Sequence, residues 1–419
     1  MTTPPVYLDH AATTPVRPEV AAAFAEAALE LGNPSSLHTR GRAARRVVEE
    51  SRESIAADLG AHPTEVIFTA GGSEADNLAV KGVWFAATEA RPEATGVAIS
   101  AVEHHAVLDA AHWLAEREGA QVTEIAVGPD GVIRLDEIAR LLDVAGPRTA
   151  VISVMWANNE VGSIQPVADV VALAAAHGVP VHSDAVQAVG HVPIDFAASG
   201  LAALALSGHK LGAPIGVGAL LARRDLAMTP VLHGGGQERG VRSGTVNTPG
   251  IRALAVAVRA AVADLTEETA RLTALRDRLV AGVLEAVPGA TLRGTPSGEH
   301  RLPGNAHFTI EGTDADALLF GLDMVGVCAS SGSACQAGVQ QPSHVLAAMG
   351  DDDVRARSAV RLTLGHTSTG SDVDTLLAVL PDVVERARAA HNPRRTPTAA
   401  ATAAATGTTA TGTTAGVSH

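Results

Sequence analysis

The middle of the chain carries short, unbroken runs of hydrophobic residues separated by stretches with helical spacing. Between about residues 60 and 225 the runs are "EVIFTA", "GVAIS", "TAVISVM", "PVHSDA" and "LAALALSG". Continuous apolar runs are typical of strands that are buried on both faces. Their alternation with helical patterns predicts an α/β fold with a parallel sheet, in which ligands bind at the carboxyl ends of the strands.

After Gly250 the pattern changes to that of a separate unit. The stretch "IRALAVAVRAAVADLTEETARLTALRDRLVAGVLEAV" predicts helices that leave the first domain. Strand-like "AHFTIEG" and "SAVRLTLG" alternate with helical "DADALLFGL" and "DVDTLLAVLPDVVERARAA", which predicts a second, α+β domain. From about Pro393 a Thr/Ala/Gly tract has almost no large apolar residue, so we expect a disordered tail.

Composition narrows the class of protein. The chain has 419 residues, of which 46% are hydrophobic and 18% charged, so it can bury a large core. A formal charge of -14 argues against nucleic-acid binding. The N-terminus does not resemble a secretion signal, and His209 and Lys210 interrupt the most apolar stretch, so neither secretion nor a membrane span is expected. Two cysteines are too few for a disulfide framework, and we expect a reducing, cytoplasmic setting.

One lysine stands out because the chain has only two, Lys81 and Lys210. Lys210 follows an apolar run, where an ammonium group loses hydration and its pKa falls. A neutral amine in such a place is nucleophilic and suits Schiff-base formation with an aldehyde. The alternative is an ordinary loop lysine.

Two further strand ends carry polar groups. Asp184 ends the strand-like "VHSD" and would serve either as a helix N-cap or as the partner of a protonated pyridine nitrogen. In "FTAGGSEADN" we expect a helix to open at Ser73, so that the N–H groups of Gly72 and Ser73 form an anion cradle, with Ser207 and His209 as further donors. An ordinary capped helix would give the same pattern.

Three more candidates lie elsewhere in the sequence. His104 in "SAVEHHAVL" lacks metal-ligand spacing, and it is either a structural hydrogen-bonding group or a ring that stacks on an aromatic cofactor and moves protons. Cys335 in "ASSGSACQAG" lies among small residues, which predicts a mobile arm that carries a thiol, whereas Cys328 suits packing. Arg361 in a predicted strand would hold a substrate carboxylate or form an ordinary ion pair.

Taken in chain order, ten segments resemble those of the cysteine desulfurases, which are pyridoxal-phosphate enzymes of fold type I in the class V aminotransferase group. They are "YLDHAATTP", "GNPSS", "FTAGGSEADNLAVKG", "EHHAVL", "NNEVG", "HSDAVQAVG", "SGHKLG", "HGGGQERGVRSGT", "SSGSAC" and "VRLTLGH". "SSGSAC" is similar to the long-loop type that serves iron–sulfur cluster assembly. Ser73 replaces the family's usual Thr, and Cys328 and the tail are not part of the pattern.

The resemblance implies a role for each site residue. Lys210 would bind pyridoxal 5'-phosphate, Asp184 would pair with the pyridine nitrogen, and His104 would stack on the ring. Asn159 and Gln187 would bond the side of the ring that carries the hydroxyl. Gly72, Ser73, Ser207 and His209 would hold the phosphate, with Thr245 supplied by the partner subunit of a homodimer. Asn33 and Arg361 would receive the substrate carboxylate.

The implied reaction removes sulfur from L-cysteine, which leaves L-alanine and a persulfide on Cys335. A sulfur acceptor or an iron–sulfur scaffold protein would then take the sulfur. The resemblance implies no resident metal, although Cys335 could ligate an iron–sulfur cluster transiently. Three alternatives stay open: another pyridoxal-phosphate lyase or aminotransferase of the same fold, such as a selenocysteine lyase; a non-catalytic scaffold; and, more remotely, a nicotinamide oxidoreductase, whose fingerprint spacing is missing.

The resemblance also suggests a division of the chain. We expect an N-terminal segment (1–16) that packs on the small domain and a large cofactor-binding domain (17–255) whose seven-stranded sheet is mostly parallel. A small C-terminal domain (256–392) would carry the catalytic Cys loop, and residues 393–419 would form the disordered tail.

Overall fold

A seven-stranded sheet forms the centre of the computed structural model, which describes residues 5–296, 298, 300–333 and 342–391. Its strands stand in the order β2-β8-β7-β6-β5-β3-β4. Their bounds are β2 (Val66–Thr69), β3 (Gly96–Ser100), β4 (Gln121–Ile125), β5 (Thr149–Ser153), β6 (Val181–Asp184), β7 (Ala203–Ser207) and β8 (Gly218–Ala222). β8 runs antiparallel to both neighbours, and the other adjacent pairs are parallel. The predicted α/β class with a seven-stranded, mostly parallel sheet is confirmed.

The five apolar runs predicted as strands all enter this sheet, as β2, β3, β5, β6 and β7, and almost all of their residues are buried. Two strands were not predicted. β4 lies at the sheet edge with mostly exposed or half-buried side chains, so it lacks an apolar run. β8 lies at the end of the apolar stretch that was read only as core.

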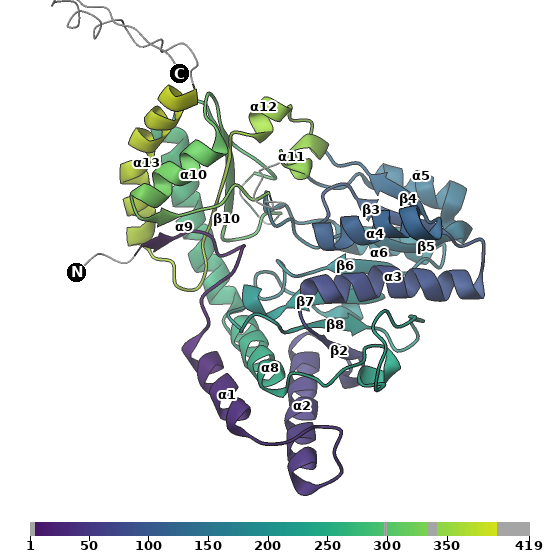
Figure 1. Cartoon of the computed structure of the whole chain (residues 1–419). Coiled ribbons are helices and arrows are strands. Elements are labelled where there is room, and N and C mark those ends of the chain that lie inside the picture. The colour runs from purple at the N-terminus through teal and green to yellow at the C-terminus, as the bar shows by residue number, and fades with distance from the viewer. Residues whose placement is uncertain (1–4, 297, 299, 334–341, 392–419) are drawn as a thin grey trace, which may run out of the picture.

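Helices cover both faces of the sheet (Figure 1). On one face, α3 (Gly72–Ala90) and α4 (His105–Glu118) pack on Ile67, Val97 and Val151. On the other face, the helices that contribute to the core are α1 (Pro18–Leu29), α2 (Thr39–Asp58), α5 (Leu135–Ala145), α6 (Val167–Ala175), α7 (Phe196–Ser199) and α8 (Thr248–Ala263).

A second hydrophobic core surrounds an antiparallel sheet in the order β12-β10-β9. Its strands are β9 (Ala290–Leu292), β10 (Asn305–Ile310) and β12 (Ala359–Thr363), and the helices beside them are α9 (Leu265–Ala286), α10 (Ala315–Met324), α11 (His344–Ala348), α12 (Asp353–Ala356) and α13 (Gly370–His391). The long amphipathic stretch after Gly250 thus forms two successive helices, α8 and α9. The predicted domain boundaries remain a prediction.

The N-terminal residues join this second core. β1 (Val6–Tyr7) pairs in parallel with β11 (Val327–Cys328), and the fully buried Leu8 belongs to the core around β10 and β12. Within the described ranges, no helix combines the length and apolarity that a bilayer crossing needs.

Candidate active site

A cavity of about 330 Å³ opens at the carboxyl edge of the seven-stranded sheet. Because parallel strands end at the same edge, β6 brings Asp184 and β7 brings Ser207 to it, and Lys210 follows in the next turn. Ten of the predicted site residues line this cavity: Gly72, Ser73, His104, Asn159, Asp184, Gln187, Ser207, His209, Lys210 and Arg361.

Lys210 is held by backbone oxygens. Its Nζ donates to the carbonyl of Ala11 at 2.6 Å and to that of Ala12 at 2.7 Å. Burial, helped by the charge of Arg361, lowers the pKa of Lys210 to about 8. A useful fraction of this amine is therefore neutral, and hence nucleophilic, near neutral pH.

Asp184 is a buried carboxyl at the end of β6. Its Oδ1 accepts the N–H of Val186 at 2.8 Å, so it closes a turn and caps no helix. Burial raises the pKa of Asp184, while the charges of His104 and Lys210 act in the opposite direction. Two buried carboxyls nearby, Asp76 and Glu103, have pKa values raised by burial and by the charge of Asp184. Among these three carboxyls, Asp184 is the one whose charged form is favoured by Lys210.

The predicted anion cradle concerns the start of α3, which lies at the cavity. The helix begins at Gly72, one residue before the expected Ser73. Its first N–H groups have no preceding turn to bond, so they are available to a ligand. A Cβ on Gly72 would lie 2.6 Å from Val186 Cγ2 and 3.5 Å from Ser207 Cβ, which means that only glycine allows this close approach to the ends of β6 and β7.

His104 and His209 are both neutral groups in this setting. Burial lowers the pKa of His104, and burial lowers that of His209 to about 4. His104 caps α4, because its Nδ1 accepts the N–H of Ala106 at 3.1 Å, so the proton resides on Nε2. The structural role considered for His104 is therefore present, and it leaves the ring among the residues that line the cavity.

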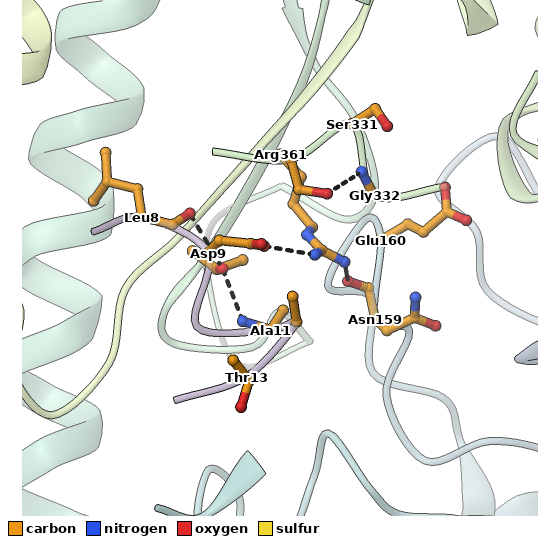
Figure 2. Close-up of polar contacts among 12 residues, drawn as sticks. Leu8, Asp9, Ala11, Thr13, Asn159, Glu160, Ser331, Gly332 and Arg361 are labelled. Carbon is orange, nitrogen blue, oxygen red and sulfur yellow. Dashed lines mark hydrogen bonds and ion pairs between the residues drawn. The ribbon is translucent and has the colours of Figure 1, made fainter. Parts of the chain in front are cut away.

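Arg361 is a buried guanidinium, only 4% exposed, on β12. Figure 2 shows it between two groups: its Nη2 donates to Asp9 Oδ1 and its Nη1 to the carbonyl of Asn159, each at 2.9 Å. The ion pair that was one interpretation of Arg361 is thus present. The side chain also lines the cavity beside Lys210, as the other interpretation requires.

Comparison with known proteins places the chain. The model of the aminotransferase class-V family matches residues 6–376. This chain belongs to the aminotransferase class-V family. Its NifS/IscS-like group is indicated by an "IscS-like cysteine desulfurase" of Mycobacterium tuberculosis, which is 54% identical over 92% of this chain and 97% of the relative.

Solved structures agree with this placement. A "NifS-like protein" matches with a TM-score of 0.84 at 34% identity, over 91% of this chain and 99% of the other. A structure titled "SspA in complex with cysteine" matches with a TM-score of 0.73 at 33% identity, over 85% of this chain and 98% of the other. The class-V chain described here therefore groups with the NifS/IscS-like cysteine desulfurases, and it has the fold type I architecture.

Two predicted site residues, Asn33 and Thr245, are not among the residues that line this cavity. Asn33 and Thr245 lie together in a different cavity of about 370 Å³, next to Gln237 and Arg239. Cys335 lies outside the described residues. The roles predicted for all of the site residues, inside the cavity and outside it, remain predictions.

Sequence analysis assigned no role to several groups that lie at this site. Asp9, Ala11 and Ala12 belong to "YLDHAATTP", a segment that carried the resemblance without any assigned role. Glu160, in "NNEVG", lines the cavity as a buried carboxyl that accepts the hydroxyl of Ser343 at 2.5 Å, and burial raises its pKa. The motifs were signals for Asp9 and Glu160, but backbone carbonyls leave no mark on a sequence.

Proposed function

We propose that this NifS/IscS-like enzyme uses pyridoxal 5'-phosphate to convert L-cysteine into L-alanine, and that Cys335 receives the sulfur as a persulfide. The balance needs no external oxidant. The C–S bond of L-cysteine breaks and a C–H bond forms, while the transferred sulfur forms an S–S bond with Cys335 and keeps one hydrogen. The observation that supports this most is the meeting of Lys210, Asp184 and the start of α3 in one cavity, which Arg361 also lines.

The residues of the cavity fit the chemical groups of the cofactor. Lys210 would hold its aldehyde carbon, Asp184 its ring nitrogen, and the N–H groups of Gly72 and Ser73 with the Ser207 hydroxyl its phosphate. Because Gly72 has no Cβ to meet Val186, the start of α3 would lie close enough to Ser207 for both to bind the same phosphate. When bound, pyridoxal 5'-phosphate supplies an electron-poor ring that stabilises negative charge on the substrate carbon beside the amino group.

The chain's own groups would handle charge and protons around that chemistry. Lys210 has a pKa of about 8, so it can give and take a proton near neutral pH. The carbonyls of Ala11 and Ala12 would hold its charged form in place. A neutral His104 would lie beside the ring without adding a second cation, and Arg361 would bind the substrate carboxylate.

The substrate and the fate of the sulfur belong to the same proposal. The similarity to a structure titled as a complex with cysteine supports L-cysteine as the ligand. The sulfur would pass from Cys335 to an acceptor protein for iron–sulfur cluster assembly or for thiolation of tRNA or another cofactor. A reducing cytoplasm suits a nucleophile that must be a free thiol.

A homodimer is the proposed assembly. Thr245 and Asn33 lie apart from Lys210 within one chain, so a shared site needs a second copy to bring them to it. Exposed Leu29, Leu31 and Leu37 near that second cavity supply apolar surface for such a contact. Light scattering on the purified protein tests this: a mass of one chain at working concentration contradicts it.

The central experiment locates the sulfur. The holoenzyme is mixed with L-cysteine and analysed by mass spectrometry of its peptides, with Cys335→Ser and Cys328→Ser as a matched pair of variants. We expect one extra sulfur atom on Cys335, loss of alanine formation in Cys335→Ser, and little change in Cys328→Ser. Undiminished alanine formation in Cys335→Ser would refute the role of Cys335, and a keto acid as the product would indicate an aminotransferase.

A further inference from the structure

The N-terminal segment from Tyr7 to Thr14 has a fixed backbone. β1 pairs with β11, and Asp9 forms a parallel bridge with Thr363 of β12. The hydroxyl of Tyr7 donates to the carbonyls of Asp9, at 3.2 Å, and of Thr13, at 2.8 Å, which closes the turn between them. Asp9 is therefore held by its own bridge to β12 and by the hydroxyl of Tyr7, next to a strand that is itself paired.

This segment reaches the two cationic groups of the cavity at once. The carbonyls of Ala11 and Ala12 accept from Lys210, and the carboxylate of Asp9 accepts from Arg361. Ala11 also accepts the side-chain N–H of Gln187 at 3.0 Å. A segment far from these residues in sequence thus forms part of the cavity wall through Ala11 and Ala12. Figure 2 shows Asp9 of this segment beside Arg361.

The guanidinium of Arg361 has spare donors after these contacts. It carries five N–H hydrogens, of which Asp9 takes one on Nη2 and Asn159 takes one on Nη1. Its Nε is buried and has no partner among the described residues. A second carboxylate could therefore bind the same guanidinium without displacing Asp9.

In the enzyme without substrate, the carboxylate of Asp9 supplies the counter-charge of the buried Arg361. The side chain of Arg361 is 4% exposed and that of Asp9 is 21% exposed, so both members of the ion pair are largely removed from water. A buried guanidinium without a counter-charge is unfavourable, and without a fixed acceptor its plane would be free to turn. Asp9 on one terminal nitrogen and Asn159 on the other determine that plane.

We propose that Asp9 is a positioning residue that orients Arg361 for the carboxylate of the α-amino acid substrate. This inference rests on the proposed function, because it assumes that Arg361 binds that carboxylate. The opposite possibility is competition, in which Asp9 occupies the place of the substrate. The two differ in sign: without the Asp9 charge, positioning predicts weaker substrate binding and competition predicts tighter binding.

The test compares Asp9→Asn with Asp225→Asn in the holoenzyme. Asp225 also pairs with an arginine, but that partner, Arg223, does not line the active-site cavity as Arg361 does, so Asp225→Asn is a control for the loss of an ion pair away from the site. Binding is measured by calorimetry with L-alanine and with ethylamine, which differ only in the carboxylate. We expect Asp9→Asn to weaken L-alanine binding about tenfold and to raise the KM for L-cysteine similarly, with a smaller effect on kcat.

Ethylamine separates positioning from general damage. Its binding should be unchanged in Asp9→Asn, whereas a merely structural role for Asp9 would weaken both ligands equally. Asp9→Glu, which restores the charge, should recover part of the L-alanine affinity. Thermal melting of each variant checks that the chain is folded.

Failure of the inference can be told from failure of the proposed function. If the unaltered enzyme makes no alanine from L-cysteine, the proposed function is wrong. If it does make alanine, then unchanged or tighter L-alanine binding in Asp9→Asn overturns the role of Asp9, and so does an equal loss for ethylamine.

Discussion

The two lysines of the chain lie in contrasting environments. Lys81 lies on α3 with its Nζ 4.5 Å from the centre of the Trp113 ring of α4, and Trp113 is 38% exposed. Lys210 lies beyond β7, where two carbonyls hold it and a second cation, Arg361, is close enough to disfavour its charge.

Burial lowers the pKa of both lysines, but their surroundings separate them. The ring of Trp113 is a π surface that stabilises a cation near solvent. At Lys210, burial and the charge of Arg361 act together and bring the pKa to about 8. The difference shows that the reactivity of an amine depends on its surroundings. Three experiments test this contrast between the two lysines, in decreasing order of expected effect.

The largest effect is expected from replacing each lysine by arginine. Lys210→Arg should reduce alanine formation from L-cysteine at least about a thousandfold, because a guanidinium stays protonated and is no nucleophile. Lys81→Arg should keep almost all activity, since arginine also stacks on an indole. Alanine assays on folded, cofactor-supplied proteins give the measurement. Activity of Lys210→Arg within tenfold of the unaltered enzyme would contradict the role of Lys210.

An intermediate effect concerns pH. In protein freed of cofactor, the rate at which trinitrobenzenesulfonate labels Lys210 should rise with pH and reach half its maximum near pH 8. The sign follows because the neutral amine reacts, and its fraction increases as the pH rises through the pKa. Peptide mass spectrometry resolves Lys210 from Lys81 in the same sample. A midpoint for Lys210 equal to that of Lys81 would remove the contrast between them.

The smallest effect concerns stability at Lys81. Trp113→Leu should lower the free energy of unfolding by about 0.5 to 1 kcal/mol, the usual size of an exposed cation–π contact, and should leave alanine formation unchanged. Denaturant unfolding measures it. With Lys81→Met as the partner variant, the double variant should lose less than the sum of the two single losses. Full additivity would show that the contact contributes nothing.

Sequence reasoning reached the sheet and most of the cavity for a common reason. Buried parallel strands are continuous apolar runs, and polar residues at their ends are conspicuous. Asp184 and Lys210 were found in this way. β4 was missed because an exposed edge strand needs no apolar run.

The site groups that could not be predicted from the sequence belong to the N-terminal segment, far in sequence from the residues that they contact. Ala11 and Ala12 act through carbonyl oxygens, which every residue has, and Asp9 meets Arg361 across 352 positions of sequence. No local pattern records such a meeting. The separation of Thr245 and Asn33 from Lys210 was equally invisible, because it depends on how whole layers pack.

The pairing of the N-terminal segment with β11 and β12 bears on how the enzyme is made. Residues 6–14 are translated long before β11 and β12, the strands that hold them. A nascent chain that has already formed its central sheet would still lack the hydrogen bonds from Lys210 to the carbonyls of Ala11 and Ala12. Binding of the proposed cofactor should therefore require that translation has passed β12, and chains terminated before β11 should accumulate without it.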